Sequence, residues 1–155
     1  MLFQFGQYKV DVDVEKTKHF YENAETVSEG CSCAECRNFE QAVTILPKSV
    51  TGFFDKLGVD MRKVCECYAN CTNEDGTLFY GGFFHVSGTM LGGESAWKEE
   101  NEEISYWHED ETFQVSENFH VSFQEGVFLL EKDFQLPVIQ VEFSANIPWV
   151  LDEEK

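Results

Sequence analysis

The chain has few basic residues, and this shortage restricts the partners that it can bind. It carries 11 Lys and Arg against 29 Asp and Glu in 155 residues, which gives a formal net charge of −18. Proteins that bind nucleic acid neutralise phosphates with Lys and Arg, so the composition argues against a nucleic-acid partner. It also disfavours anionic membrane surfaces. A basic protein partner fits the charge, because opposite charges steer association.

Long apolar runs are absent as well. No stretch approaches the roughly 20 apolar residues of a membrane-spanning helix. The first residues, MLFQFGQYKV, alternate apolar and polar side chains and lack the positive start and unbroken apolar segment of a signal peptide. We therefore expect a cytoplasmic protein that does not associate with membranes.

The common catalytic and ligand-binding motifs are also missing. The sequence contains no glycine-rich phosphate-binding loop, no nucleophile elbow, no metalloprotease helix motif and no EF-hand loop. Its acidic runs, such as those at 99–103 and 109–111, are typical of solvated surface. The sequence thus offers no recognised catalytic constellation, and we favour a protein that is not an enzyme.

Aromatic residues, in contrast, are plentiful. The 15 Phe and the hydrophobic fraction of 43% exclude general disorder. The length suits one domain, and no internal repeat or low-complexity linker divides the chain. We therefore expect a single domain over residues 1–155.

Hydrophobic periodicity predicts both helices and strands. Alternation indicates a strand or hairpin around Gly6, and a spacing of three and four indicates helices that Pro47 and Gly58 terminate. Clean alternation at the end of the chain indicates antiparallel strands with one wet face, which carries Gln140 and Glu142. This order favours an α+β fold with a helical hairpin packed on an antiparallel sheet; a β-sandwich with a helical insert is the alternative. The predicted helices cover 13–24, 34–46 and 47–57. The predicted strands cover 2–14, 64–71, 77–86, 104–107, 112–116, 119–123 and 138–143, and the acidic segment 92–103 is expected to be a loop or a short helix.

The cysteines give the most specific chemical signal in the chain. They form one C-x-C-x2-C group and one C-x-C-x3-C group. Thiolates at such spacing can converge on one soft metal ion, and zinc takes four ligands. Three thiols of the first group and one of the second would complete a structural zinc site, whereas all six could hold a small polynuclear centre. Free buried thiols and disulfide or redox roles remain open alternatives. The candidate ligands are Cys31, Cys33 and Cys36, with Cys65, Cys67 and Cys71 as additional candidates.

Four segments carry a resemblance to a known family. The stretches CSCAECRNF, LPKSVTGFFDKLGVD, YGGFFHVSG and PVIQVEFSANIPWVL resemble a family of small uncharacterised bacterial proteins that has no assigned activity. The C-x-C-x2-C-R-N segment is the most distinctive part. The resemblance implies a bacterial, cytosolic, single-domain protein and supplies no catalytic residues. It covers the group at 31–36 and does not include the group at 65–71.

Two hypotheses on function follow. The first is a non-enzymatic binding or interaction protein, stiffened by a metal ion such as zinc at the first cysteine group. The second is a thiol-dependent enzyme with its site between the helical hairpin and the sheet. In that case Cys36, Arg37 and His85 are the first residues to suspect.

Overall fold

The chain begins as a β-hairpin in which buried and exposed side chains alternate. In the computed structural model, which describes residues 1–154, β1 (Leu2–Phe5) pairs antiparallel with β2 (Tyr8–Val12). Gly6 lies in the turn with φ +58°, a conformation that favours glycine. The predicted hairpin around Gly6 is confirmed.

Four α-helices follow, and the sequence predicts three of them. Asp13 caps the first helix, since its side chain accepts a hydrogen bond from the Lys16 N–H. Gly58, with φ +84°, ends the last one. The second helix has only four residues and lies outside the predicted helices; Thr26 and Glu29 form a capping box at its start. The helices are α1 (Val14–Asn23), α2 (Val27–Gly30), α3 (Ala34–Ala42) and α4 (Lys48–Leu57), with short 3-10 turns η1 (Val43–Ile45), η2 (Met61–Lys63) and η3 (Glu109–Glu111).

Seven strands form a single antiparallel sheet. Its order is β1-β2-β4-β9-β8-β7, and β3 pairs with the first half of β4. The long central strand extends beyond its predicted end because β9 and then β2 continue the pairing along it. Most of the acidic segment is irregular, as predicted, but Trp97–Glu99 form one strand of a separate two-stranded sheet, which the prediction of a loop or short helix did not include. The remaining strands are β3 (Glu66–Thr72), β4 (Leu78–Gly92), β5 (Trp97–Glu99), β6 (Ser105–Trp107), β7 (Phe113–Ser116), β8 (Phe119–Gln124) and β9 (Val138–Ile147).

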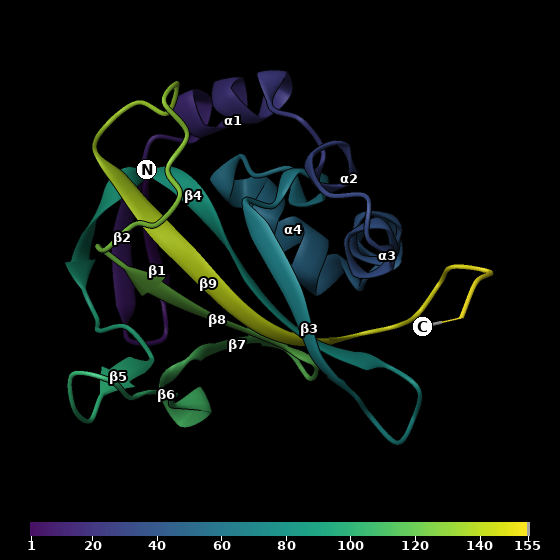
Figure 1. Cartoon of the computed structure of the whole chain (residues 1–155). Helices are drawn as coiled ribbons and strands as arrows, with labels where there is room; N and C mark the ends of the chain where they lie inside the picture. The colour runs from purple at the N-terminus through teal and green to yellow at the C-terminus, as the bar shows by residue number, and fades with distance from the viewer. Residues whose placement is uncertain (155) are drawn as a thin grey trace.

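Aromatic side chains connect the helices with one face of this sheet. The ring of Phe39 on α3 lies 5.6 Å from that of Tyr80, and the ring of Phe54 on α4 lies 4.8 Å from that of Phe84. Figure 1 shows the helices gathered on one side of the molecule and the β5–β6 hairpin on the opposite side. The α+β class is thus confirmed, with one large sheet and four helices.

The opposite face of the sheet is polar, yet it is not wet. Gln140 is fully buried and Glu142 is only 6% exposed, so the prediction of a solvated face on β9 is wrong. Two segments cover these residues: the Trp97 indole of the β5–β6 hairpin donates to Glu142, and the backbone N–H of Phe128, in the loop after β8, donates to Gln140. The sheet therefore separates an apolar layer from a buried polar layer.

Candidate metal centre

Three thiols of the first cysteine group converge on one point. The sulfur atoms of Cys31, Cys33 and Cys36 all lie within 4.8 Å of one another, and the first two are 3.3 Å apart. In a tetrahedral zinc–thiolate site, Zn–S bonds of about 2.3 Å place the sulfur atoms roughly 3.8 Å apart. The observed spacing therefore matches that of a site for one soft metal ion.

The local sequence explains this convergence. The capping box fixes the start of α2. At its end, the backbone N–H of Cys31 donates to the backbone oxygen of Val27 at 2.9 Å, which turns the chain back after α2. Cys33 is the N-cap residue of α3, and Cys36 lies in the first turn of that helix, with 5% of its surface exposed. A tight turn followed at once by a helix start brings three side chains together over six residues.

A second connection holds α2 against α3. The carboxylate of Glu40 accepts hydrogen bonds from the backbone N–H and the hydroxyl of Ser28, at 3.1 and 2.7 Å. Burial alone would raise the pKa of Glu40, but the hydrogen bonds from Ser28 outweigh it and lower that pKa. The turn that carries the thiols is thus fixed on both sides.

Cys67 brings a fourth thiol from the sheet. It lies on β3 opposite Gly82, it is 9% exposed, and its thiol interacts with that of Cys36. The Cys67 sulfur is not within 4.8 Å of all three sulfurs of the first group, and Cys36 is the member of that group with which it interacts. In the zinc alternative, one thiol of the second group would complete the set, and Cys67 is the member of that group whose thiol interacts with Cys36.

The other two cysteines have different surroundings. The Cys65 thiol donates to the backbone oxygen of Leu129 at 3.6 Å. Cys71 is exposed, because a β-bulge between Ala69 and Cys71 shifts the register by one residue and places it opposite Phe79. The second group therefore does not converge as the first one does, and the structure does not assemble a six-thiol centre.

The four clustered thiols differ in their electrostatics. The backbone N–H of Cys33 donates to the Cys31 thiol and lowers its pKa, with further help from the other two thiols. Burial raises the pKa of Cys36 and raises that of Cys67 to about 12. A metal ion binds the deprotonated forms, so a divalent cation would offset the burial that keeps these two thiols neutral.

A cavity adjoins the thiols. It has a volume of about 780 Å³, and its lining includes Cys31, Cys36, Cys65 and Cys67 together with His19. Within residues 1–154, however, no hydrogen bond or ion pair joins a thiol to an imidazole. The cavity thus gives access to the cluster without supplying a base in contact with it.

The three residues suspected for a thiol enzyme do not form one site. Arg37 donates to the backbone oxygen of Ser32 and pairs with Glu153 at 2.6 Å. The His85 ring is hydrogen-bonded to Gln140 at 2.9 Å, in the buried polar layer of the sheet, and burial lowers its pKa. Cys36 instead contacts the other thiols.

Comparison of the chain with models of protein families, with curated proteins and with solved structures finds no match. The resemblance to a bacterial family therefore stays a prediction. Among residues 1–154, no helix has the length and the apolar character that crossing a bilayer requires.

Proposed function

We propose that the protein is a non-enzymatic binding module in which one zinc ion, held by Cys31, Cys33, Cys36 and Cys67, fastens the α2–α3 turn to the sheet. The convergence of the first three sulfur atoms within 4.8 Å is the observation that carries this proposal. The fourth ligand rests on the electrostatic interaction between the Cys67 and Cys36 thiols and on the cavity that both residues line.

The chemistry of the donors favours zinc over harder metals. Four thiolates form the ligand set of structural zinc sites, whereas calcium and magnesium require oxygen ligands. With all four positions filled by sulfur, no position stays open for a substrate or a reactive water molecule. A closed site is structural, which agrees with a role in holding the fold.

The metal would attach the α2–α3 turn to the sheet, in addition to the hydrogen bonds that hold α2 against α3. Cys31 and Cys33 are exposed, and Ser32 between them is held through its backbone oxygen by the Arg37 side chain. Because the bound ion would link this exposed turn to buried positions on α3 and β3, the free energy of metal binding would add to the free energy of unfolding. The surface built around the turn would then have one conformation for a partner to recognise.

Cobalt substitution tests the proposal. Protein purified with a reductant and freed of metal is titrated with Co²⁺, whose visible and near-ultraviolet bands report tetrahedral geometry and thiolate ligation. We expect intense thiolate-to-metal bands that saturate at one ion per chain and disappear on addition of zinc. Cobalt bands that are weak and typical of octahedral oxygen ligands would refute the site.

A further inference from the structure

A second cavity lies on the other side of the sheet, between the β5–β6 hairpin and the loop after β8. Its volume is about 590 Å³, within the range of small-ligand sites. Its lining combines aromatic and acidic residues, and within residues 1–154 it includes no Lys or Arg. The acidic and aromatic side chains of the lining are Glu142, Glu94, Glu99, Glu125, Trp97 and Phe128.

Glu142 is the unusual member of this lining. Its carboxylate is 6% exposed, and none of the ion pairs within residues 1–154 includes it. Both of its oxygens accept hydrogen bonds, one from the Gln140 amide at 2.6 Å and one from the Trp97 indole N–H at 3.3 Å. A carboxylate that accepts from donors on both oxygens is arranged to be ionised, and a buried charge without a countercharge is costly.

The orientation of Gln140 is fixed, which strengthens this assignment. Its side-chain oxygen accepts from the backbone N–H of Phe128 at 2.8 Å, so its NH2 group faces Glu142. Burial raises the pKa of Glu142, and a nearby Glu66 adds to the rise, while the two hydrogen bonds oppose it. A cation next to this carboxylate would offset both effects that disfavour its ionised form, the burial and the repulsion by Glu66.

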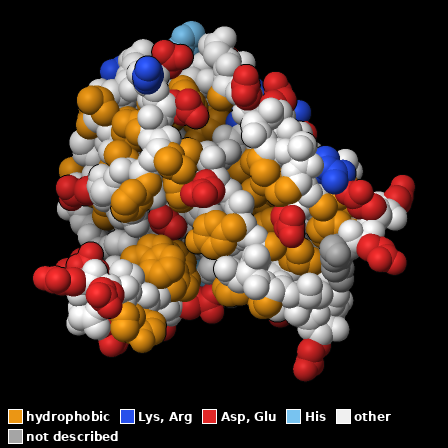
Figure 2. Space-filling model, in the orientation of Figure 1, with side chains coloured by type: hydrophobic (Ala, Val, Ile, Leu, Met, Phe, Trp, Pro, Cys, Tyr) orange, Lys and Arg blue, Asp and Glu red, His pale blue; other side chains and the backbone are white. Residues whose placement is uncertain are grey.

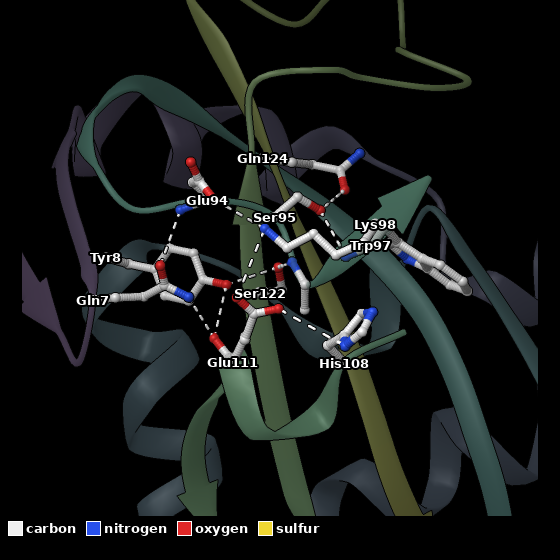
Figure 3. A network of polar contacts seen from close by, with 11 residues as sticks. Gln7, Tyr8, Glu94, Ser95, Trp97, Lys98, His108, Glu111, Ser122 and Gln124 are labelled. Atoms are coloured by element: carbon white, nitrogen blue, oxygen red, sulfur yellow. Dashed lines mark hydrogen bonds and ion pairs between the residues drawn. The ribbon is translucent and has the colours of Figure 1, made fainter. Parts of the chain in front are cut away.

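The walls of the cavity are already in place. Ala96 donates from its backbone N–H to the Ser122 hydroxyl at 2.8 Å, and the Ser95 hydroxyl donates to Gln124 at 3.1 Å. Figure 3 shows this network joining the hairpin that carries Trp97 to the sheet. Gln124 also donates to the backbone oxygen of Gly126 at 2.8 Å, which holds the loop leading to the opposite wall. Such preorganisation reduces the entropy lost on binding.

One cation lies beside the cavity. Lys98 on the hairpin pairs with Glu94 of the lining at 3.0 Å and with Glu111 at 3.8 Å, so it compensates part of the lining charge, whereas none of the ion pairs within residues 1–154 includes Glu99, Glu125 or Glu142. In Figure 2 the Lys and Arg side chains occupy only the upper part of the face drawn, and the lower part, where the hairpin lies, shows acidic and hydrophobic side chains. The cavity therefore combines an acidic lining, an aromatic wall and a buried carboxylate.

We infer that this cavity binds an organic cation, a substituted ammonium or guanidinium group, with Glu142 as its counter-ion and with Trp97 and Phe128 as aromatic walls. Aromatic rings attract such cations through their quadrupole, and the carboxylate supplies a charge-assisted contact. The group can belong to a free amine or to a Lys or Arg side chain of a basic partner. The inference specifies the ligand of the proposed binding module and is independent of the metal site.

Calorimetric titration with four probes tests the inference. The probes are choline, its uncharged carbon isostere dimethylbutanol, agmatine and a blocked Gly-Arg-Gly peptide. We expect saturable binding of the cations, no binding of dimethylbutanol, and quenching of tryptophan fluorescence because Trp97 lines the cavity. Tighter binding of agmatine than of the peptide would identify a free amine, and the reverse would identify a side chain of a partner.

Three variants distinguish the site from general acidity. Glu142→Gln keeps the shape and should weaken the cation roughly 10- to 100-fold, as expected for a hydrogen bond to a charged group. Phe128→Ala changes a side chain that is 62% exposed, so folding should be unaffected, and binding should weaken about 2- to 5-fold. Glu102→Gln removes an exposed charge outside the lining and should change nothing.

Three results would overturn the inference: no saturable binding of any cation, equal binding of dimethylbutanol, or unchanged binding by both the Glu142 and the Phe128 variants. If Glu142→Gln does not fold, Phe128→Ala together with Glu125→Gln, another exposed change in the lining, decides the outcome. The zinc content of the same samples is measured in parallel. A failure of the metal site would then leave cation binding intact, and a failure of cation binding would leave the zinc content intact.

Discussion

Replacement of Cys67 by serine tests whether this thiol, and not another thiol near or on β3, is the fourth zinc ligand. Serine has nearly the same size but supplies no thiolate, so Cys67→Ser removes the proposed ligand and leaves the strand pairing in place. Cys71→Ser is the matched control, because Cys71 lies four residues further along the same strand and is exposed. We expect zinc affinity to fall in the first variant and to stay unchanged in the second.

The expected loss of zinc affinity, and the fall in Tm that results from it, follow from the removal of one of four ligands. Loss of residues that merely orient metal ligands costs about 10- to 100-fold in affinity, so loss of a ligand itself should cost about 100-fold or more. With free zinc at about 1,000 times the dissociation constant, the ion stabilises the fold by about 4.1 kcal/mol, and after a 100-fold weakening by about 1.4 kcal/mol. The difference of about 2.7 kcal/mol corresponds to a fall in Tm of about 5–11 °C for a domain of this size.

The assay compares thermal unfolding with and without metal. Tm is measured for the wild type and for both variants in buffered zinc and again in chelator, and the zinc-dependent difference is taken for each protein. This difference removes any cost of placing a hydroxyl at a buried position, since that cost is present in both conditions. Equal zinc-dependent differences for the wild type and Cys67→Ser would refute Cys67 as a ligand.

Two further predictions concern the elements that hold the site. Glu40→Gln should lower the free energy of unfolding by about 1 kcal/mol at pH 7, because the hydrogen bonds from Ser28 then lose their charged acceptor. Because the folded protein lowers the pKa of Glu40, the stability that this carboxylate contributes is complete above the ordinary carboxyl pKa and disappears as the pH falls through the lowered value. The free energies of unfolding of the two proteins, measured by urea titration, should therefore differ at neutral pH and become equal in acid. A difference that persists or grows in acid would contradict this. Gly58→Ala should cost about 1–3 kcal/mol, because φ is +84° and the new Cβ would lie 2.7 Å from a backbone oxygen of α1. Gly52→Ala, within α4, is the control. It should stabilise the fold by about 0.5–1 kcal/mol, because nothing lies within 4 Å of the added atom. Equal effects of the two changes in urea denaturation would contradict the assignment of strain to Gly58.

Local patterns predicted much of the fold. The cap at Asp13, the stop at Gly58 and the alternating residues of β2 and β9 all depend on neighbours within a few residues, and each gave its element correctly. Helix α2 was missed because four residues are too few to show helical periodicity. The capping box of Thr26 and Glu29 was the signal that could have revealed it.

The candidate site was predictable in part, and the limit has a physical cause. The first cysteine group converges within one turn, so its spacing alone indicates the cluster. In the second group, strict alternation would place Cys67 and Cys71 on the same face of the strand. The bulge after Ala69 breaks that alternation and turns Cys71 away, and no Gly or Pro in the sequence marks its position.

The buried polar layer depended on contacts that are distant in sequence. Alternation correctly grouped Gln140 and Glu142 on the polar face of β9, but a period of two does not tell which polar face another segment covers. Trp97 reaches Glu142 from 45 residues away in the sequence. The acidic segment that carries Trp97 forms a strand because it pairs with β6 and is anchored to the sheet, although its composition indicates a solvated loop.

The metal content of the purified protein shows whether the clustered thiols hold zinc. Protein prepared under reducing conditions, without exposure to chelator, is measured by elemental analysis and by thiol titration on the same sample. We expect one zinc ion per chain, released on modification of the thiols, and at least fourfold lower occupancy in Cys33→Ser than in Cys71→Ser. Less than roughly a tenth of an equivalent of zinc in protein whose thiols are reduced would contradict it, because a closed thiolate site binds zinc too tightly to lose it during purification.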